Sequence, residues 1–190
     1  MPIAIGEKLE SDFRNPLGLL SDCHRRIERF LDGMIVISEQ AGGSELNDVQ
    51  RQHFEVALRY FRDAASKHTL DEEESLFPRL QAHKNAETDA ALALLDTLHD
   101  EHVDAEIRHR RVDDIGRKWL VERRLPPDDV QLLVSLLRGL RTTYETHIAV
   151  EETELFPLAG RFLGSEELEA IGREMASRRG LVMSGRVFER

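Results

Sequence analysis

Two segments of the chain carry a histidine followed four residues later by a glutamate, within otherwise similar surroundings. Residues 68–78 read HTLDEEESLFP and residues 147–157 read HIAVEETELFP. The matching positions all lie at one constant offset of 79 residues, which indicates an internal repeat rather than chance composition. The identical pairs are His68 and His147, Glu72 and Glu151, Glu73 and Glu152, Leu76 and Leu155, Phe77 and Phe156, and Pro78 and Pro157.

The spacing within each segment places the histidine and the glutamate on one face of a helix. A residue four positions further along an α-helix is rotated by only about 40° and raised by about 6 Å. His68 therefore shares a face with Glu72, and His147 shares a face with Glu151. Burying two carboxylates is unfavourable unless a positive charge compensates them, and no lysine or arginine recurs with them. We expect a metal ion there, because facing histidine and carboxylate side chains build metal sites in helical bundles.

A second, shorter correspondence adds one histidine to each half of the chain. It has an offset of 78 residues and precedes the first correspondence in both halves. The chain is thus predicted to be a duplicated unit with one histidine in each quarter. The matching pairs are Leu20 and Leu98, Asp22 and Asp100, His24 and His102, and Glu28 and Glu106.

The apolar residues recur at steps of three and four, which predicts helices that are buried on one face. Proline and glycine signals divide the chain into four long helices, with a short fifth helix from Ser165 to about Arg179. We predict an all-α fold, an antiparallel up-down-up-down four-helix bundle with a short additional C-terminal helix. The expected long helices cover about 16–41, 48–77 and 88–123, and a fourth runs from the LPPDD stretch at 125–129 to about 157. The expected divisions are a leader at 1–15, the bundle at 16–162, and the C-terminal helix and tail at 163–190.

The four histidines test this arrangement, because two residues of an antiparallel hairpin lie at one depth when the turn is midway between them. The midpoint of His24 and His68 is residue 46, inside GGSELND, and that of His68 and His102 is Asn85. The midpoint of His102 and His147 lies beside Pro126. All three midpoints fall on separately recognised turn signals. The histidines are therefore predicted to converge on one level of the bundle.

The predicted ligand set limits the choice of metal. Four histidines and two glutamates are too many ligands for one tetrahedral zinc ion. Histidine with carboxylate, and without thiolate, suits two iron or manganese ions that the two glutamates bridge. Zinc and manganese are the less favoured alternatives to iron.

The two HxxxE segments, with one histidine on each of the first and third helices, resemble the hemerythrin-like (HHE cation-binding) family over roughly residues 16–160. The resemblance implies a non-haem di-iron centre of the Fe-O-Fe type. Members of the family bind oxygen, sense oxygen, nitric oxide or iron, or handle iron under stress. The ligands that the resemblance implies are His24, His68, Glu72, His102, His147 and Glu151.

The sequence departs from the oxygen-carrying hemerythrins in two places. Their third helix presents HxxxH, whereas His99 and His102 are separated by three positions. Their fourth helix has an aspartate five positions after its histidine, whereas Glu151 follows His147 by four. Both departures weaken an interpretation as a reversible oxygen carrier. His99 is a candidate additional ligand, although an exposed histidine on the helix shoulder is the alternative.

Several residues near this pattern have two interpretations. Glu28 and Glu106 each follow a predicted ligand by four positions, so they are either carboxylates that orient the imidazoles or surface acids. Tyr60 and Tyr144 either line the site or pack in the core. A third group is expected to lie outside the site: Glu73, Glu74 and Glu152 facing solvent, and His53, His83 and His109 as histidines that bind no metal.

Composition excludes several other functions. A formal net charge of −10 disfavours nucleic acid and anionic membranes as partners, and no run of eighteen apolar residues could span a bilayer. The first fifteen residues lack a secretory pattern, and the single Cys23 cannot form an internal disulfide; both predict a cytoplasmic protein. We expect a di-iron protein that senses or handles O₂, NO, peroxide or iron. Alternatives are a di-iron enzyme that turns over peroxide or NO, a reversible O₂-binding or storage protein, and a bundle stabilised by metal.

Overall fold

The computed structural model describes residues 11–183, and this part of the chain is helical and contains no strand, as predicted. Most of the predicted leader, at 1–10, and the end of the tail, at 184–190, lie outside the described residues. The α-helices are α1 (Pro16–Ala41), α2 (Asp48–Tyr60), α3 (Ser66–Asp71), α4 (Phe77–Ala82), α5 (Asp89–Leu92), α6 (Leu95–Glu122), α7 (Pro127–Val150), α8 (Phe156–Phe162) and α9 (Ser165–Arg178). Three π-helical turns join some of them, namely η1 (Phe61–Ala65), η2 (Glu72–Leu76) and η3 (Glu151–Leu155).

The helical path continues through both Phe-Pro pairs, so the prediction that Pro78 and Pro157 end their helices was wrong. In η2 the N–H of Phe77 donates to the carbonyl of Glu72, five residues back, and in η3 Phe156 donates to Glu151 in the same way. A π turn is one residue wider than an α turn, which gives space for a proline ring that would clash with an α-helical carbonyl. The repeat therefore includes the π turns.

The turns follow the sequence signals more closely. Gly42 adopts a left-handed conformation with φ 53° at the end of α1, and its N–H donates to the carbonyl of Ser38. Asn47 and Gln50 form a capping box at the start of α2, so side chains satisfy the exposed N–H groups of the first turn. The expected third helix starts differently: α5 is a short separate helix, and the long α6 begins only at Leu95.

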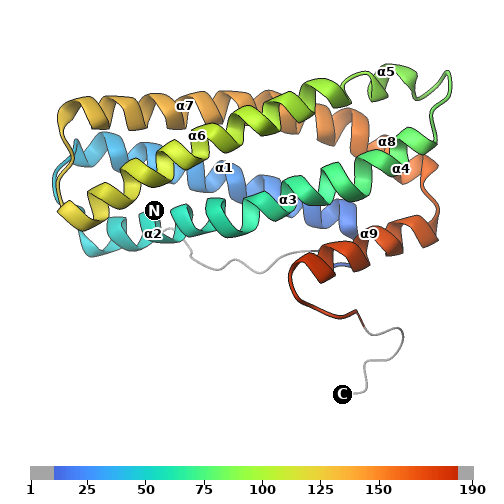
Figure 1. Ribbon diagram of the computed structural model, residues 1–190, viewed down its shortest axis with the longest axis horizontal. Coiled ribbons are helices and arrows are strands. Elements are labelled where there is room, and N and C mark those ends of the chain that lie inside the picture. Colours follow the sequence, from blue (N-terminus) through green and yellow to red (C-terminus); the bar gives the residue numbers. More distant parts are fainter. Residues whose placement is uncertain (1–10, 184–190) are drawn as a thin grey trace.

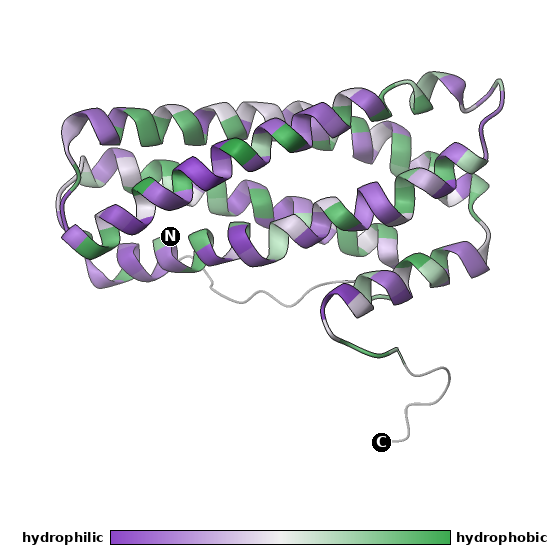
Figure 2. Cartoon of the chain, in the orientation of Figure 1, coloured by the Kyte–Doolittle hydropathy of each residue, from purple (hydrophilic) through white to green (hydrophobic). Residues whose placement is uncertain are grey.

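The long helical segments lie side by side along the length of the molecule (Figure 1). Helix α1 packs against α2 and α7, and α6 packs against α2 and α7. Apolar residues alternate with polar ones along these helices (Figure 2), and two separate apolar clusters result. We call them the distal cluster, which includes Phe54, Trp119 and Leu133, and the proximal cluster, which includes Leu20, Leu76, Leu155 and Ile171.

Helix α9 lies along the side of the bundle in its right-hand half (Figure 1) and packs against α1 and α3. Its buried face consists of Ile171, Met175 and Ala176 in addition to Gly172. A Cβ atom at Gly172 would lie 1.9 Å from the carbonyl oxygen of Phe13, so this close approach requires glycine. Among residues 11–183, no helix combines the length and apolarity needed to cross a membrane.

Candidate metal centre

The six predicted ligands lie together between the two apolar clusters. On α1, for example, Leu20 belongs to the proximal cluster, Ile27 belongs to the distal cluster, and His24 lies between them. All six side chains are buried, and none is more than 8% exposed. The same order holds on the other three segments, where the polar layer consists of His68 and Glu72, of His102, and of His147 and Glu151.

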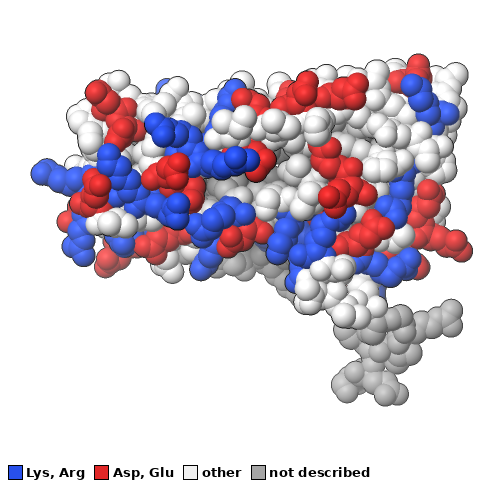
Figure 3. All heavy atoms as spheres, in the orientation of Figure 1, with Lys and Arg blue, Asp and Glu red and all other residues white. Residues whose placement is uncertain are grey.

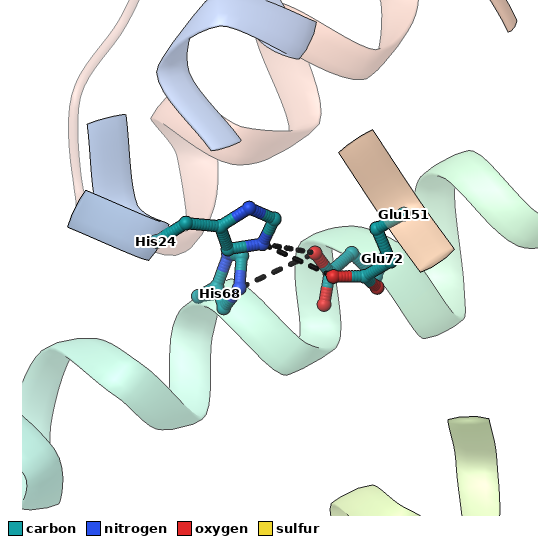
Figure 4. A group of neighbouring side chains, drawn as sticks. All are labelled: His24, His68, Glu72 and Glu151. Carbon is teal, nitrogen blue, oxygen red and sulfur yellow. Dashed lines mark ion pairs between the residues drawn. The ribbon is translucent and has the colours of Figure 1, made fainter. Parts of the chain in front are cut away.

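One group of ligand atoms gathers His24, His68 and one oxygen of each glutamate (Figure 4). Nε2 of His24 lies 3.1 Å from Oε2 of Glu151 and 3.6 Å from Oε1 of Glu72. Nε2 of His68 lies 3.3 Å from the same Oε1 of Glu72. These four atoms all lie within 4.8 Å of one another, which is close enough for a single cation to contact them all.

A second group gathers His102, His147 and the other oxygen of each glutamate. Nε2 of His102 lies 3.4 Å from Oε2 of Glu72, and Nε2 of His147 lies 3.3 Å from Oε1 of Glu151. Each glutamate therefore turns one carboxylate oxygen toward each group. This arrangement places Glu72 and Glu151 between two neighbouring sites that each contain two imidazoles.

The buried carboxylates fit a pair of cations. All four carboxylate oxygens of Glu72 and Glu151 are buried and have no hydrogen-bond partner within residues 11–183. Buried carboxylates normally accept hydrogen bonds or coordinate a metal, because leaving water without compensation is very unfavourable. Two cations, each contacting two imidazole nitrogens and one oxygen from each glutamate, would satisfy all four oxygens.

Burial and neighbouring charges act against each other on the pKa values of these side chains. Burial raises the pKa of Glu72, but the imidazoles of His68, His102 and His24 outweigh it and hold that pKa well below its usual range. Burial lowers the pKa of His102, but Glu72 and Glu73 outweigh it and raise that pKa to about 9. For His68 burial is the dominant effect, and it lowers the pKa of this imidazole to about 4. The metal-free site thus holds protons that a cation would displace.

Three of the four imidazoles are oriented by a further carboxylate at 2.8 Å from Nδ1. A carboxylate only accepts, so Nδ1 must donate, and in the neutral ring Nε2 is left unprotonated and able to bind a metal. The pairs are His24 with Glu152, His102 with Glu73, and His147 with Glu101.

Glu73 and Glu152 correct the expectation that these residues face solvent. Each is the second residue of a π turn, in which a residue advances less around the axis than the 100° of an α-helix, and each reaches an imidazole on a neighbouring helix. Their recurrence in both repeats was a signal that could have identified them. Glu101 has no counterpart in the repeat, so no comparable signal marked it.

Glu28 and Glu106, the residues first considered for this orienting role, pair with arginines instead. Glu28 lies 3.5 Å from Nη1 of Arg141, and the exposed Glu106 lies 2.5 Å from Nη2 of Arg110. Glu74 does face solvent, as expected.

His68 differs from the other three imidazoles. Its Nδ1 is buried and has no hydrogen-bond partner in the described part of the chain. The side chain is 3% exposed, so it has little contact with solvent. No carboxylate in the described part of the chain therefore fixes the ring of His68 through Nδ1, although its Nε2 lies 3.3 Å from Oε1 of Glu72.

His99 lies outside both groups of ligand atoms. Its side chain is 59% exposed, and its Nδ1 lies 2.9 Å from Oε2 of Glu73. Glu73 thus contacts both His99 at the surface and His102 at the centre. Glu73 therefore lies between His99 and His102, and His99 does not reach the centre itself.

A cavity of about 440 Å³ opens beside the centre and is lined by residues of η1, α3, α6 and α7. Buried His102 and Tyr144 lie in its wall, whereas exposed His99 and Glu106 also line it. A hydrogen bond of 3.1 Å joins Tyr144 Oη to Nε2 of His109, whose pKa burial lowers to about 4. The cavity connects the surface with the His102 side of the centre.

The remaining predicted residues lie elsewhere. Tyr60 donates to the carbonyl of Cys23 at 3.3 Å, and Cys23 is a buried free thiol whose pKa burial raises. His53 is buried next to Gly33, where a Cβ would lie 2.2 Å from its Nε2. His83 pairs with Glu167 at 3.0 Å. None of these side chains belongs to either group of ligand atoms.

Comparison with known proteins agrees with this geometry. The family model described as Hemerythrin HHE cation binding domain matches residues 15–159, which include all six buried side chains. A comparison with curated proteins finds no match. The family match covers well over half of the chain and contains both HxxxE segments, and the structure brings these together into two groups that could hold metal ions. The chain therefore belongs to the hemerythrin HHE cation-binding family.

Proposed function

We propose that this protein binds two non-haem iron ions and uses them to sense or handle O₂, NO, peroxide or iron under oxidative or nitrosative stress. One observation carries the proposal: Glu72 and Glu151 each turn one carboxylate oxygen toward each of the two groups of ligand atoms. This division supports two ions joined by two carboxylates rather than one ion held by six side chains.

Iron is favoured by the kinds of ligand. The two groups together offer four imidazoles and two carboxylates and contain no thiolate, a set that suits iron or manganese and exceeds the four ligands of tetrahedral zinc. When bound, an iron pair supplies redox chemistry and coordination positions for small ligands. Manganese remains the alternative metal.

The chain's own residues would hold and tune such a centre. Glu73, Glu101 and Glu152 fix three imidazoles with Nε2 facing the glutamates. The cavity gives small molecules a path toward His102, and the Tyr144 and His109 pair supplies hydrogen-bonding groups in its wall. These features support a centre that meets small ligands from one side.

Further parts of the proposal concern topology and location. We infer an up-down-up-down antiparallel order of the four long segments, because short connections at 42–47 and 123–126 join neighbouring helices. We also propose a cytoplasmic protein without nucleic-acid or membrane partners, based on the lone Cys23 and the acidic net charge. A protein partner is not identified by these features.

The decisive experiment combines elemental analysis with absorption spectroscopy. The protein is purified anaerobically, loaded with ferrous iron, and its spectrum is recorded before and after addition of air, peroxide and NO. We expect about two iron ions per chain and a lasting spectral change after exposure. One tightly bound zinc ion per chain, with no response to these additions, would overturn the proposal. A spectrum that air changes and oxygen removal fully restores would favour oxygen storage instead.

An enzyme that turns over peroxide or NO is the second candidate, favoured by the cavity. Ala65 is buried in its wall, so Ala65→Phe should fill part of the cavity, whereas Ala65→Ser should keep it open. If the protein is an enzyme, the loaded protein should consume many equivalents of peroxide or NO. Ala65→Phe should then slow this consumption at unchanged iron content, and Ala65→Ser should not. Consumption that stops at about one equivalent per centre would exclude this candidate.

A further inference from the structure

Helix α9 lies beyond residues 15–159, the part of the chain that matches the family model, and it contacts only one of the two repeats closely. It packs against α3 and η2, which carry His68 and Glu72. The corresponding segments of the second repeat, the end of α7 and η3, are not among its principal neighbours. Helix α9 therefore supports one half of the ligand set.

The main polar contact joins α9 to Asp71, the residue before Glu72. The Asp71 side chain is fully buried, and its two carboxylate oxygens accept separately from two arginines of the α9 end. Nη1 of Arg178 donates to Oδ1 at 2.9 Å, and Nη2 of Arg179 donates to Oδ2 at 2.7 Å. Breaking a buried ion pair leaves an uncompensated charge, which makes such a contact strongly favour the docked arrangement.

Arg178 also forms hydrogen bonds with η2, the π turn that follows Asp71. Its Nη2 donates to Oγ of Ser75 at 2.8 Å and lies 3.2 Å from a carboxylate oxygen of Glu74. Nearer the N-terminus of α9, Glu174 pairs with Arg79 at 2.6 Å, and Glu167 pairs with His83 at 3.0 Å. Figure 3 shows basic and acidic side chains close together over the region where α9 meets the bundle. Polar pairs thus accompany the whole apolar face of α9.

The second repeat lacks the residues that form these contacts with α9 in the first repeat. Val150 stands where the first repeat has Asp71, and Glu154 stands where it has Ser75. A valine cannot pair with an arginine. The ligands themselves, however, are identical in the two repeats. Two of the differences between the copies, at Asp71 and Ser75, therefore lie where the first repeat contacts α9.

We propose that α9 is a clamp that fixes the first repeat in its ligand geometry and thereby limits the rate at which metal leaves the centre. This inference rests on the metal-binding function proposed above. His68 is the imidazole without an orienting carboxylate, so its position depends on the backbone of its own helix. Asp71, one turn away and held by Arg178 and Arg179, anchors that backbone. Arg178 and Arg179 are positioning residues for His68 and Glu72.

Hydrogen exchange of the metal-free protein tests the clamp without relying on metal. The double variant Arg178→Ala/Arg179→Ala should exchange the amides of residues 66–76 faster, while those of 147–155 should change little. Arg173→Ala is the matched control, because the ion pair of exposed Arg173 among residues 11–183 is with Glu169 of the same helix. Equal exchange of residues 66–76 in the double variant and the wild type would overturn the proposal.

Metal release to a chelator tests the second half of the proposal. We expect the double variant to release metal faster by about 10-fold or more, the scale on which outer residues affect metal affinity. Adding Asp71→Asn should restore part of the difference, because it removes the unpaired buried charge. Leu133→Ala, in the distal cluster, controls for general destabilisation and should change release much less at a comparable loss of thermal stability.

The two experiments separate failure of the clamp from failure of the proposed function. Release that is as slow in the double variant as in the wild type, or as fast in Leu133→Ala at a matched loss of stability, overturns the clamp. If the wild type binds no metal, the proposed function fails, and the clamp's role in release fails with it. The exchange experiment then still decides whether α9 holds the first repeat in place.

Discussion

The two HxxxE segments present the same ligands but are supported in different ways. In the second repeat the imidazole itself is held, because Nδ1 of His147 donates to Glu101 of α6 at 2.8 Å. In the first repeat the imidazole of His68 has no such partner among the described residues, and the helix beneath it is held through Asp71. One copy is stabilised at the ring and the other at the backbone.

This difference shows which features the duplication had to keep. A cation fixes the type and position of its ligands, and both repeats retain the histidine, the glutamate and the π turn. Support for the ligands can come from any neighbouring element, so it follows what each repeat packs against. The first repeat faces α9, and the second faces α6.

The largest expected effect would come from the bridging carboxylates, where the two repeats should behave alike. Glu72→Ala and Glu151→Ala should each reduce metal from about two ions per chain to nearly none, because each glutamate serves both groups of ligand atoms. Thermal stability of the loaded protein should fall as well. Elemental analysis of the purified variants measures this. Loss of only one ion in either variant would mean that the sites are independent.

The next effect concerns the three carboxylates that orient imidazoles, of which Glu101 supports the second repeat. Glu101→Ala should weaken metal binding by about 10- to 100-fold, because it frees the ring of His147. Glu73→Ala and Glu152→Ala should have effects of similar size through His102 and His24. Competition with a chelator of known affinity measures the change. Glu154→Ala, an exposed acid of η3, is the control and should bind metal normally.

A smaller effect should appear in the pH dependence of the metal-free protein. The folded-state pKa of His102 is raised to about 9, so its contribution to stability is complete below its ordinary value near 6.5 and is lost as pH rises through 9. The pKa of His68 is lowered to about 4, so stability is instead lost as pH falls from about 6.5 toward 4. His102→Gln should reduce the alkaline slope, and His68→Gln should reduce the acidic slope. Calorimetric unfolding across pH 4–10 (roughly the span of these two values) measures both, and unchanged slopes would contradict the assigned environments.

The smallest effect is expected at the surface. His99→Ala removes an exposed hydrogen bond to Glu73 but no atom of either ligand group. Metal content and the ferric spectrum should therefore remain nearly unchanged, while His102→Ala should lose metal. A variant of His99 that loses one ion would show that this histidine binds metal directly and that the two sites are less alike than the structure indicates.

The sequence predicted the helical fold and the converging residues because both depend on regular spacing. Apolar steps of three and four identified the long helices, and the hairpin midpoints brought His24, His68, His102 and His147 to one level. Rotation by 100° per residue failed at Glu73 and Glu152, because a π turn changes the angular position of the residues around it.

Contacts between distant segments could not be predicted from spacing. Glu101 reaches His147 from another helix, and Arg178 reaches Asp71 across 107 positions of the chain. Neither contact has a repeated counterpart in the sequence. They depend on how α6 and α9 are placed against the repeats, which is a tertiary property rather than a local pattern.

The layer of histidine and glutamate that separates the proximal and distal clusters also has a consequence for folding cooperativity. Apolar contact normally makes a small domain unfold as one unit, but among residues 11–183 the two clusters are separate, and the helices and the polar layer connect them. Without cations, four buried carboxylate oxygens lie at that junction without hydrogen-bond partners in the described chain. The proximal end, which includes α9, should then be able to open while the distal end remains folded, and cations at the junction would merge the two ends into one cooperative unit.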